Sequence, residues 1–447
     1  MISTEPKEIQ NRTGWGRVIS AHSGVFRPEY LTDLHAIVRN TTQTLLPYGC
    51  SRSYGDVALN AKGDHIQMTR LNRMLSFDKK TLQLICESGV TVMDIQRTFL
   101  PRGMGLQTSP GTGWVTVGGA IANDVHGKNH DHVGSFSAGI VWFELLLANG
   151  EIIRCSREQN LLIFSATIGG MGLTGVITTV CLQLSKQPMA VLTRNEFLPT
   201  PEALISRLFS VRDTATYSVA WLDLLSAGKK LGRSILSIGE PDITQAPMPI
   251  LSNKSLPIFA PFFLNAITMR AFNALHHYRA LHKQSASIEP LTQFLYPLDA
   301  IQNWNVVYGE KGFYQFQCVI PDSAAEAGIK AIIDTIRTSD EKPYLAVVKT
   351  LGSRGEGLLS FAMKGITIAL DFPNKKNTLA VLKKLEAITL SHHGRIYFAK
   401  DACLSAESVA VMYPQLAQFQ AVLDDIDPDH RWDSMLSQRL HIRKKNG

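Results

Sequence analysis

A loop of small residues near the N-terminus has the composition needed to hold an anion. The segment PYGCSRSYGD, residues 47–56, places Gly49, Ser51, Ser53 and Gly55 at every second position. Small side chains let backbone N–H groups turn toward a negative charge such as a diphosphate. Ordinary turns share this composition, so the segment does not identify a ligand by itself.

A second glycine-rich segment, SPGTGWVTVGGAIANDVHGKNH, spans residues 109–130. Four glycines surround a β-branched run, and a small-residue turn then leads to His126 and Lys128. This spacing suits backbone that passes close to a flat ligand, with two titratable side chains beside it. Taken separately, His126 could be a buried structural histidine and Lys128 a solvated surface lysine.

A third segment, ATIGGMGLTGVITTV, spans residues 166–180 and ends in a strand-like run. It lacks the GxGxxG spacing before a helix, which disfavours a Rossmann dinucleotide site. The chain also has no Walker loop, HExxH or GxSxG pattern, so nucleotide hydrolysis, zinc chemistry and serine hydrolysis lack their required residues. No metal site is expected.

The elements that carry these loops form two regions. A chain of 447 residues is long enough for two cores. Short apolar runs broken by glycine predict a strand-rich region from Pro47 to about Gln187, including a hairpin with a type I′ turn at Asn149-Gly150. From about Met189 to Ser391, helical and strand-like segments alternate and predict a separate α+β domain. Spacing of Leu416, Phe419, Val422 and Leu423 predicts a closing helix.

Charge and composition limit the location and the partners. The net charge of +7 comes from dispersed basic residues without interleaved aromatics, so no nucleic-acid partner is expected, and an anionic substrate is weakly favoured. The start of the chain lacks a secretion signal and no long apolar window is present, which favours a cytoplasmic protein. The apolar stretch at 256–284 is either a core or lid helix or an interfacial helix in peripheral contact with the inner face of the membrane.

Together the glycine-rich segments resemble the FAD-binding domain of the vanillyl-alcohol oxidase / p-cresol methylhydroxylase (PCMH) superfamily. The resemblance is strongest to the decaprenylphosphoryl-β-D-ribose oxidase family and covers nearly the whole chain. The matching stretches are TGWGR near Trp15, RSYGD at Arg52, VTVGGAIANDVHGKNH at Val115, GGMGLTG at Gly169, YPLD at Tyr296, FYQFQ at Phe313 and YFAKDA at Tyr397.

This resemblance implies an α+β flavoprotein of two domains. Residues 1–188 would form the PCMH-type FAD-binding domain, residues 189–395 a substrate-binding domain with an antiparallel sheet, and residues 396–447 a segment that returns to the FAD domain. The residues implied in FAD binding are Gly49, Ser51, Arg52, Ser53, Tyr54, Gly111, Thr112, Gly118, Gly119, Asn123, Val125, His126, Gly175, Ile177 and Tyr397. Members with covalent flavin carry a histidine at the position of Arg52, and arginine cannot serve as that nucleophile. Noncovalent FAD is therefore expected.

The resemblance also implies a substrate site beside the flavin. Oxidation of a carbinol by hydride transfer needs a base for the hydroxyl proton and a cation for the charge that develops. Lys400 is the leading candidate, with His126 and Lys128 as further catalytic residues. Tyr296, Gln317 and Lys349 would bind the substrate, with the lysines able to meet a phosphate.

Three functions remain open from the sequence. The first is oxidation of a sugar hydroxyl to a ketone on a polyprenyl-phosphate pentose, with a short-chain dehydrogenase/reductase completing an epimerisation for cell-envelope biosynthesis. The second is oxidation of a soluble alditol or aldonolactone. The third is a non-catalytic flavin-fold protein, which the joint presence of His126, Lys128 and Lys400 disfavours.

Ala369 stands where mycobacterial members of the family carry a cysteine beside the flavin, so inhibitors that trap that cysteine should fail here.

Overall fold

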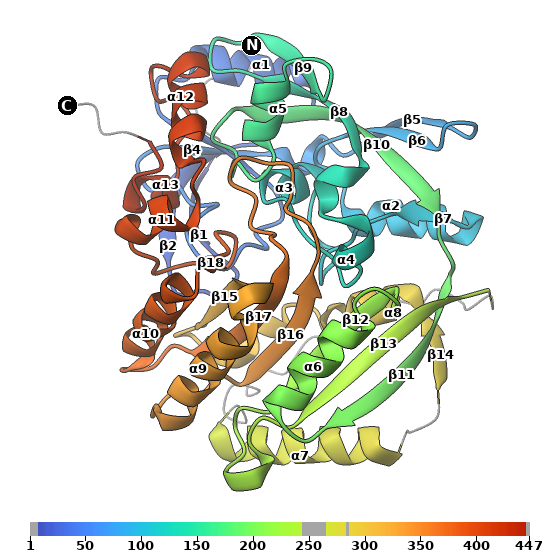
Figure 1. Cartoon of the computed structure of the whole chain (residues 1–447). Helices are drawn as coiled ribbons and strands as arrows, with labels where there is room; N and C mark the ends of the chain where they lie inside the picture. The colour runs from blue at the N-terminus through green and yellow to red at the C-terminus, as the bar shows by residue number, and fades with distance from the viewer. Residues whose placement is uncertain (1–7, 244–264, 283–285, 444–447) are drawn as a thin grey trace.

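The protein is described here by a computed structural model that covers residues 8–243, 265–282 and 286–443 (Figure 1). These residues form three β-sheets with helices packed around them. Two smaller sheets come from the N-terminal part of the chain, and one large antiparallel sheet comes from the part that follows. The predicted α+β class with an antiparallel sheet in the second region is confirmed.

The two smaller sheets hold the glycine-rich loops. The four-stranded sheet has the order β1 (Ile9–Thr13), β2 (Ser20–Phe26), β4 (Asp64–Gln67), β3 (Leu45–Tyr48). The main path of the other sheet is β5 (Met74–Asp78), β6 (Gln83–Glu87), β10 (Val176–Lys186), β8 (Ile140–Leu146), β9 (Ile152–Ser156), with β7 (Met104–Leu106) paired to β10. Helices of this part are α1 (Leu31–Asn40), α2 (Val92–Phe99), α3 (Val117–Ala122), α4 (His130–Val133) and α5 (Leu161–Thr167).

The predicted hairpin at Asn149-Gly150 is confirmed, but the predicted type I′ turn is wrong. Strands β8 and β9 pair antiparallel on either side of it. A type I′ turn needs positive φ at both central residues, whereas only Gly150 has it, with φ of 84°. The N–H of Gly150 donates to Leu147 O at 3.0 Å, so Gly150 is the last residue of the turn instead of a central one.

The large sheet separates a helical layer from the glycine-rich loops. Its order is β14 (Ser287–Pro290), β11 (Ala190–Leu198), β13 (Ser234–Asp242), β12 (Tyr217–Leu222), β16 (Leu345–Leu351), β17 (Gly365–Pro373), β15 (Phe313–Pro321), β18 (Arg395–Ile396). Helices α6 (Pro201–Val211), α9 (Ala325–Thr338) and α10 (Thr378–Ser391) cover its outer face (Figure 1). Two further helices of this region are α7 (Ala266–His282) and α8 (Leu291–Leu295).

Period-2 alternation on the central strands of this sheet creates two different faces. Phe316, Val348 and Leu370 are buried in the core beneath the helices. The alternate residues face the opposite way, and the register places Gln317 beside Ala369 and Val347 beside Ala369. The sheet therefore presents a patch of polar and apolar side chains toward the glycine-rich loops.

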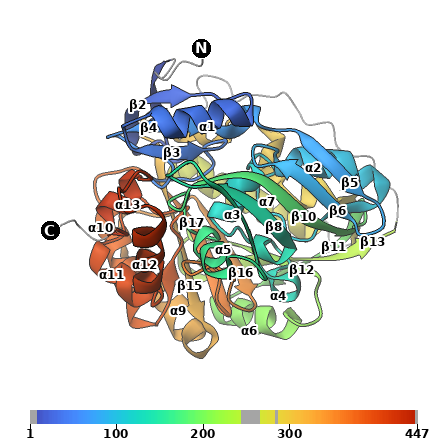
Figure 2. The ribbon, with the colours of Figure 1, turned by 90° about the horizontal axis from the view of Figure 1, so that it is seen from above.

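The C-terminal arm packs back on the first sheet, as Figure 2 shows from above. It consists of α11 (Ala406–Met412), α12 (Leu416–Ile426) and α13 (Met435–Arg439). Trp432 is fully buried and forms a bridge with Leu45 of β3. The predicted closing helix is confirmed as α12, with Phe419, Val422 and Leu423 buried.

One residue of this arm joins two segments that are remote in sequence. Arg439 donates to both carboxylate oxygens of Asp56 at 2.8 Å and to Asp401 at 2.7 Å. The Asp56 and Asp401 side chains are each 3% exposed, so the guanidinium neutralises two buried carboxylates. The N–H of Tyr54 also donates to Ala399 O at 2.8 Å. The first glycine-rich loop is thus fastened to the segment 397–402.

Substitution of Gly55 by alanine tests this junction. A Cβ at Gly55 would lie 1.7 Å from Asp401 O, which is backbone and cannot rotate away. We expect Gly55→Ala to lower the free energy of unfolding by about 1–3 kcal/mol through this overlap. The midpoint temperature of unfolding measures the loss.

Gly139→Ala is the matched control, because its Cβ would meet only Gln183 O at 3.7 Å. It should change stability by less than about 0.5 kcal/mol. Equal midpoints for the two variants would contradict close packing at Gly55.

Candidate active site

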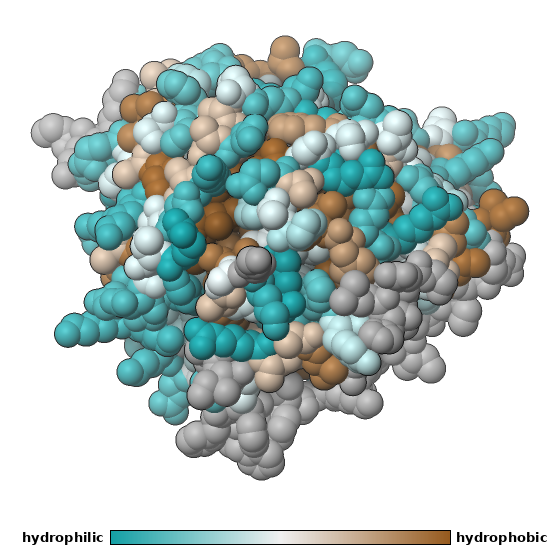
Figure 3. All heavy atoms as spheres, turned by 60° about the horizontal axis from the view of Figure 1, so that its bottom comes forward, coloured by the Kyte–Doolittle hydropathy of each residue, from teal (hydrophilic) through white to brown (hydrophobic). Residues whose placement is uncertain are grey.

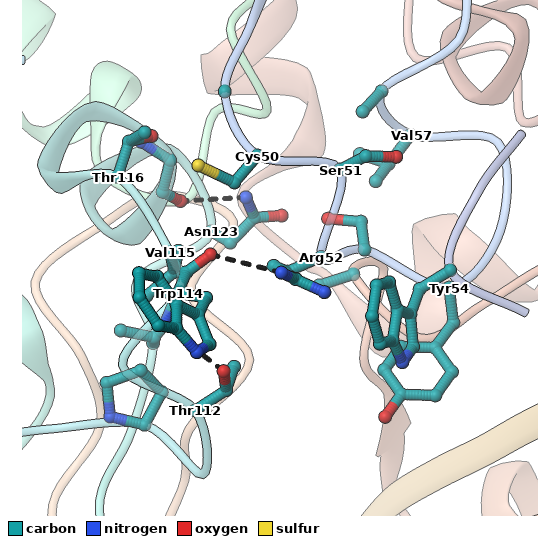
Figure 4. A pocket seen from close by; sticks show the side chains of 18 of the residues that line it. Cys50, Ser51, Arg52, Tyr54, Val57, Thr112, Trp114, Val115, Thr116 and Asn123 are labelled. Atoms are coloured by element: carbon teal, nitrogen blue, oxygen red, sulfur yellow. Dashed lines mark hydrogen bonds between the residues drawn. The ribbon is translucent and has the colours of Figure 1, made fainter. Parts of the chain in front are cut away.

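A cavity of about 590 Å³ lies between the glycine-rich loops and the inner face of the large sheet. In Figure 4 the loop Cys50–Tyr54 faces the segment Thr112–Thr116 across this space. The volume is that of an ordinary small-molecule site. Residues from β15, β16 and β17 close the cavity on the side of the sheet.

Residues 49–54 of the first loop line the cavity. Ser51 has a φ of 53°, a left-handed conformation that bends the chain here, and its hydroxyl donates to Thr13 O at 2.9 Å. Carbonyl groups of Ser53 and Tyr54 accept from Trp15 and Gly16. Within the described residues, the N–H groups of residues 50–53 have no acceptor in the protein. Such a row of unpaired N–H groups is an anion-binding nest.

Hydrogen bonds from its backbone N–H groups hold the second loop in place, and its glycines have no side chain to cover that backbone. Gly113 N–H donates to the Asp299 carboxylate at 2.8 Å, and Gly118 N–H donates to Ser88 O at 2.8 Å. A Cβ at Gly118 would lie 3.0 Å from the Ser88 side chain, whereas one at Gly111 would meet nothing within 4 Å. The backbone of this loop therefore forms an open wall of the cavity at Gly111.

Arg52 links the two loops. Its Nε donates to Trp114 O at 3.2 Å (Figure 4). Its guanidinium lies 4.0 Å from the ring centroid of Trp15. Burial lowers the pKa of Arg52, and several nearby acidic groups oppose this shift. The stacked guanidinium closes one side of the nest and adds positive charge to it.

These features fit the FAD expected from the sequence. A diphosphate would find the unpaired N–H groups of residues 50–53 and the charge of Arg52. All the residues implied in FAD binding line the cavity. Tyr397 donates its hydroxyl to Asn123 O at 2.8 Å, which joins the segment 397–402 to the second loop.

Two lysines reach the cavity beside the sheet. Lys400 Nζ lies 3.8 Å from the ring centroid of Tyr54, and burial lowers its pKa to about 7 although Asp371 acts in the opposite direction. Lys349 Nζ lies 2.8 Å from His126 Nδ1 and donates to Gly127 O at 2.8 Å. Burial also lowers the pKa of Lys349 to about 7. Both amines can therefore be uncharged near neutral pH.

Gln317 and His126 complete this side of the cavity. The amide nitrogen of Gln317 is 3.1 Å from His126 Nε2. The imidazole also packs against the rings of Phe361 and Tyr397, with centroids 5.6 Å apart in both pairs. Burial, followed by Lys349, lowers the pKa of His126 well below its ordinary value. A neutral imidazole is the expected form.

Lys128 and Tyr296 lie behind the cavity wall and do not line it. Lys128 Nζ donates to Phe294 O and lies 4.3 Å from that residue's ring centroid. The hydroxyl of Tyr296 bonds to Ser109, and burial raises the pKa of Tyr296. Their assignment to the reaction remains a prediction.

The sequence did not single out Gln315 and Asp371, which belong to the same site. Gln315 Nε2 donates to Asp371 Oδ1 at 2.5 Å, and burial raises the pKa of Asp371 to about 7. Gln315 lines the cavity. The alternation of FYQFQ could have indicated Gln315, since it shares a strand face with Gln317, but only strand pairing brings in Asp371.

Fold and site together define an FAD-dependent oxidoreductase that acts on CH–OH groups. A family model described as an FAD binding domain matches residues 22–156. The chain is 33% identical to decaprenylphosphoryl-β-D-ribose oxidase of Mycolicibacterium smegmatis, over 99% of this chain and all of that protein. It therefore belongs to the PCMH-type flavoprotein family that includes that oxidase.

Lactone-oxidising proteins are also similar to the chain. L-gulono-1,4-lactone dehydrogenase of Mycobacterium tuberculosis is 24% identical over 93% of this chain and 95% of that protein. L-gulonolactone oxidase of Bos taurus is 31% identical, but over only 36% of each chain.

The pH dependence of stability tests the burial of Lys128. Burial lowers its pKa in the folded protein from 10.5 to about 8. Between these values the unfolded chain holds a proton that the folded protein lacks, so Lys128 makes stability rise with pH. We expect Lys128→Met to reduce that rise by up to about 1.4 kcal/mol per pH unit between pH 8 and 10.

Urea unfolding at several pH values measures this effect. Lys376→Met, at an exposed lysine, is the control and should leave the slope unchanged. An unaltered slope in Lys128→Met would show that Lys128 is not buried as described.

Proposed function

We propose that the protein binds FAD noncovalently and oxidises a sugar hydroxyl to a ketone on a polyprenyl-phosphate pentose. The observation that carries this proposal is the similarity to decaprenylphosphoryl-β-D-ribose oxidase over the full chain. Residues from each matching motif line one cavity, which supports the proposal. When bound, FAD accepts the hydride from the carbinol carbon.

Lys400 takes the proton of the substrate hydroxyl in this proposal. Above a pH of about 7 its amine is uncharged and can accept a proton. The O–H bond of the substrate breaks and an N–H bond forms on Lys400, while the ring of Tyr54 contacts the resulting ammonium. Asp371 favours the charged lysine, because its Coulomb interaction raises the pKa of Lys400.

The product would pass to a short-chain dehydrogenase/reductase, since net epimerisation requires the ketone to be reduced on the other face. A lipid-linked substrate also requires contact with a membrane surface. None of the described helices is long and apolar enough to cross a membrane. Of the run at 256–284 proposed for such contact, residues 256–264 and 283–284 lie outside the described residues, and most of the remainder forms α7. The face that Figure 3 brings forward carries hydrophilic residues with smaller hydrophobic groups between them.

Denaturation should release the flavin if the cofactor is noncovalent. Arg52 occupies the position of the flavin-linking histidine, and its guanidinium is stacked on Trp15. We expect acid precipitation to leave all the flavin absorbance in the supernatant. A precipitate that keeps yellow colour and in-gel flavin fluorescence would contradict noncovalent binding.

Anaerobic reduction of the bound flavin tests the substrate. We expect a polyprenyl-phosphate pentose to bleach the flavin spectrum, and pentitols and aldonolactones at equal concentration to leave it unchanged. The Lys400→Met variant should keep FAD bound, but the substrate should reduce its flavin at least about 100-fold more slowly than in the wild type.

Bleaching by soluble sugars instead would support the second candidate function, an alditol or lactone oxidase. That candidate is favoured by the similarity to L-gulono-1,4-lactone dehydrogenase over 93% of the chain. Purified protein without flavin would contradict both candidates.

A further inference from the structure

A chain of hydrogen bonds in the cavity wall starts at a backbone carbonyl. The hydroxyl of Thr367 donates to Cys318 O at 2.8 Å. A carbonyl can only accept, so this bond uses the single hydrogen of the hydroxyl. The oxygen of Thr367 is then left as an acceptor for any other neighbour.

That neighbour is the side-chain amide of Gln317. One terminal atom of the amide lies 3.2 Å from Thr367 Oγ1 and 3.1 Å from His126 Nε2. Because Thr367 accepts, this atom must be the NH₂ group, which has two hydrogens and no acceptor capacity. His126 Nε2 therefore accepts from Gln317 and carries no hydrogen.

The hydrogen of the neutral imidazole must then lie on Nδ1. His126 Nδ1 faces Lys349 Nζ at 2.8 Å. A charged ammonium has three donors and no lone pair, so it would place two donors against each other. An uncharged amine accepts from Nδ1, gives one hydrogen to Gly127 O and keeps one for the cavity that Lys349 lines.

The surrounding groups favour the uncharged amine. Burial lowers the pKa of Lys349 to about 7, the nearby Lys128 and Lys400 act in the same direction, and Asp131 opposes them. Asp131 accepts a hydrogen bond from Thr350 at 2.5 Å and pairs with Arg212 at 3.5 Å. His130 accepts from Gly352 N–H at its Nδ1, and burial keeps it neutral by lowering its pKa to about 3. Within the part of the chain that the structure describes, Lys349 therefore has no carboxylate as an ion-pair partner.

We propose that Lys349 is held as an uncharged amine whose lone pair is taken by His126, so that it donates a hydrogen bond to the reacting oxygen and leaves proton abstraction to Lys400. The division of roles rests on the proposed function, whereas the protonation of the pair does not. An uncharged Lys349 also implies that this amine contacts a hydroxyl of the substrate and that a phosphate group of the substrate is bound elsewhere.

Nitrogen NMR of the FAD-bound protein labelled with ¹⁵N-histidine tests the protonation. His126→Gln and His130→Gln identify the two resonance pairs. His126 should show hydrogen on Nδ1, and His130 should show it on Nε2, because Gly352 donates to its Nδ1 at 3.0 Å. His130 is thus an internal control for the opposite tautomer. Hydrogen on Nε2 of wild-type His126 would overturn the proposal whatever the substrate is.

Gln317→Glu provides a designed reversal of the tautomer. A carboxylate only accepts, so His126 Nε2 should become protonated in this variant while His130 is unchanged. An unchanged His126 spectrum in Gln317→Glu would show that the amide does not set the tautomer, and it would also overturn the proposal.

The pH profile of flavin reduction separates the two lysines. The rate should rise with pH through about 7 in the wild type, as Lys400 loses its proton. Lys349→Met should lower the rate about tenfold or more but keep this rise, and Lys400→Met should lose it. Loss of the rise in Lys349→Met alone would make Lys349 the base and contradict the assigned roles.

Discussion

The site depends on the neutralisation of two buried carboxylates by Arg439. Asp56 ends the first glycine-rich loop and Asp401 follows Lys400, so one guanidinium holds together the loop that faces the cavity and the residue proposed as base. Buried ion pairs are costly to break, because the partner left behind remains charged in an apolar environment. The close approach of Gly55 to Asp401 O and the bond from Tyr54 to Ala399 complete the same junction.

The side of the cavity away from Arg52, where Lys349 and Lys400 lie, is poor in permanent charge. The pKa values of Lys349 and Lys400 are both about 7. Small changes in the environment can therefore change the protonation of these amines near neutral pH. A low-dielectric wall strengthens every remaining dipole, including the unpaired N–H groups of residues 50–53. The protein thus separates a polar cradle for an anion from a reaction zone in which protons can move.

The sequence predicted the local parts of this site better than their assembly. The loops at 47–56 and 109–130 could be recognised because small residues at fixed spacing leave the backbone accessible to a ligand. Lys128 appears beside His126 in the sequence, yet its side chain turns to Phe294 O, which periodicity cannot reveal. Asp371 and Arg439 reach the site only through strand register and the return of the C-terminal arm. Such long-range contacts leave no local pattern to read.

The return of the C-terminal arm orders events during synthesis. Residue 439 lies 383 positions after Asp56, so the ribosome makes Arg439 long after it has made the loop that contains Asp56. Until Arg439 has been made, the buried carboxylates lack their partner, and its ion pairs do not yet hold the loop at 47–56 to the segment 397–402. The junction between these two segments can therefore form only after Arg439 has been made. A chain that stops before Arg439 carries the motif residues of a flavoenzyme without this junction.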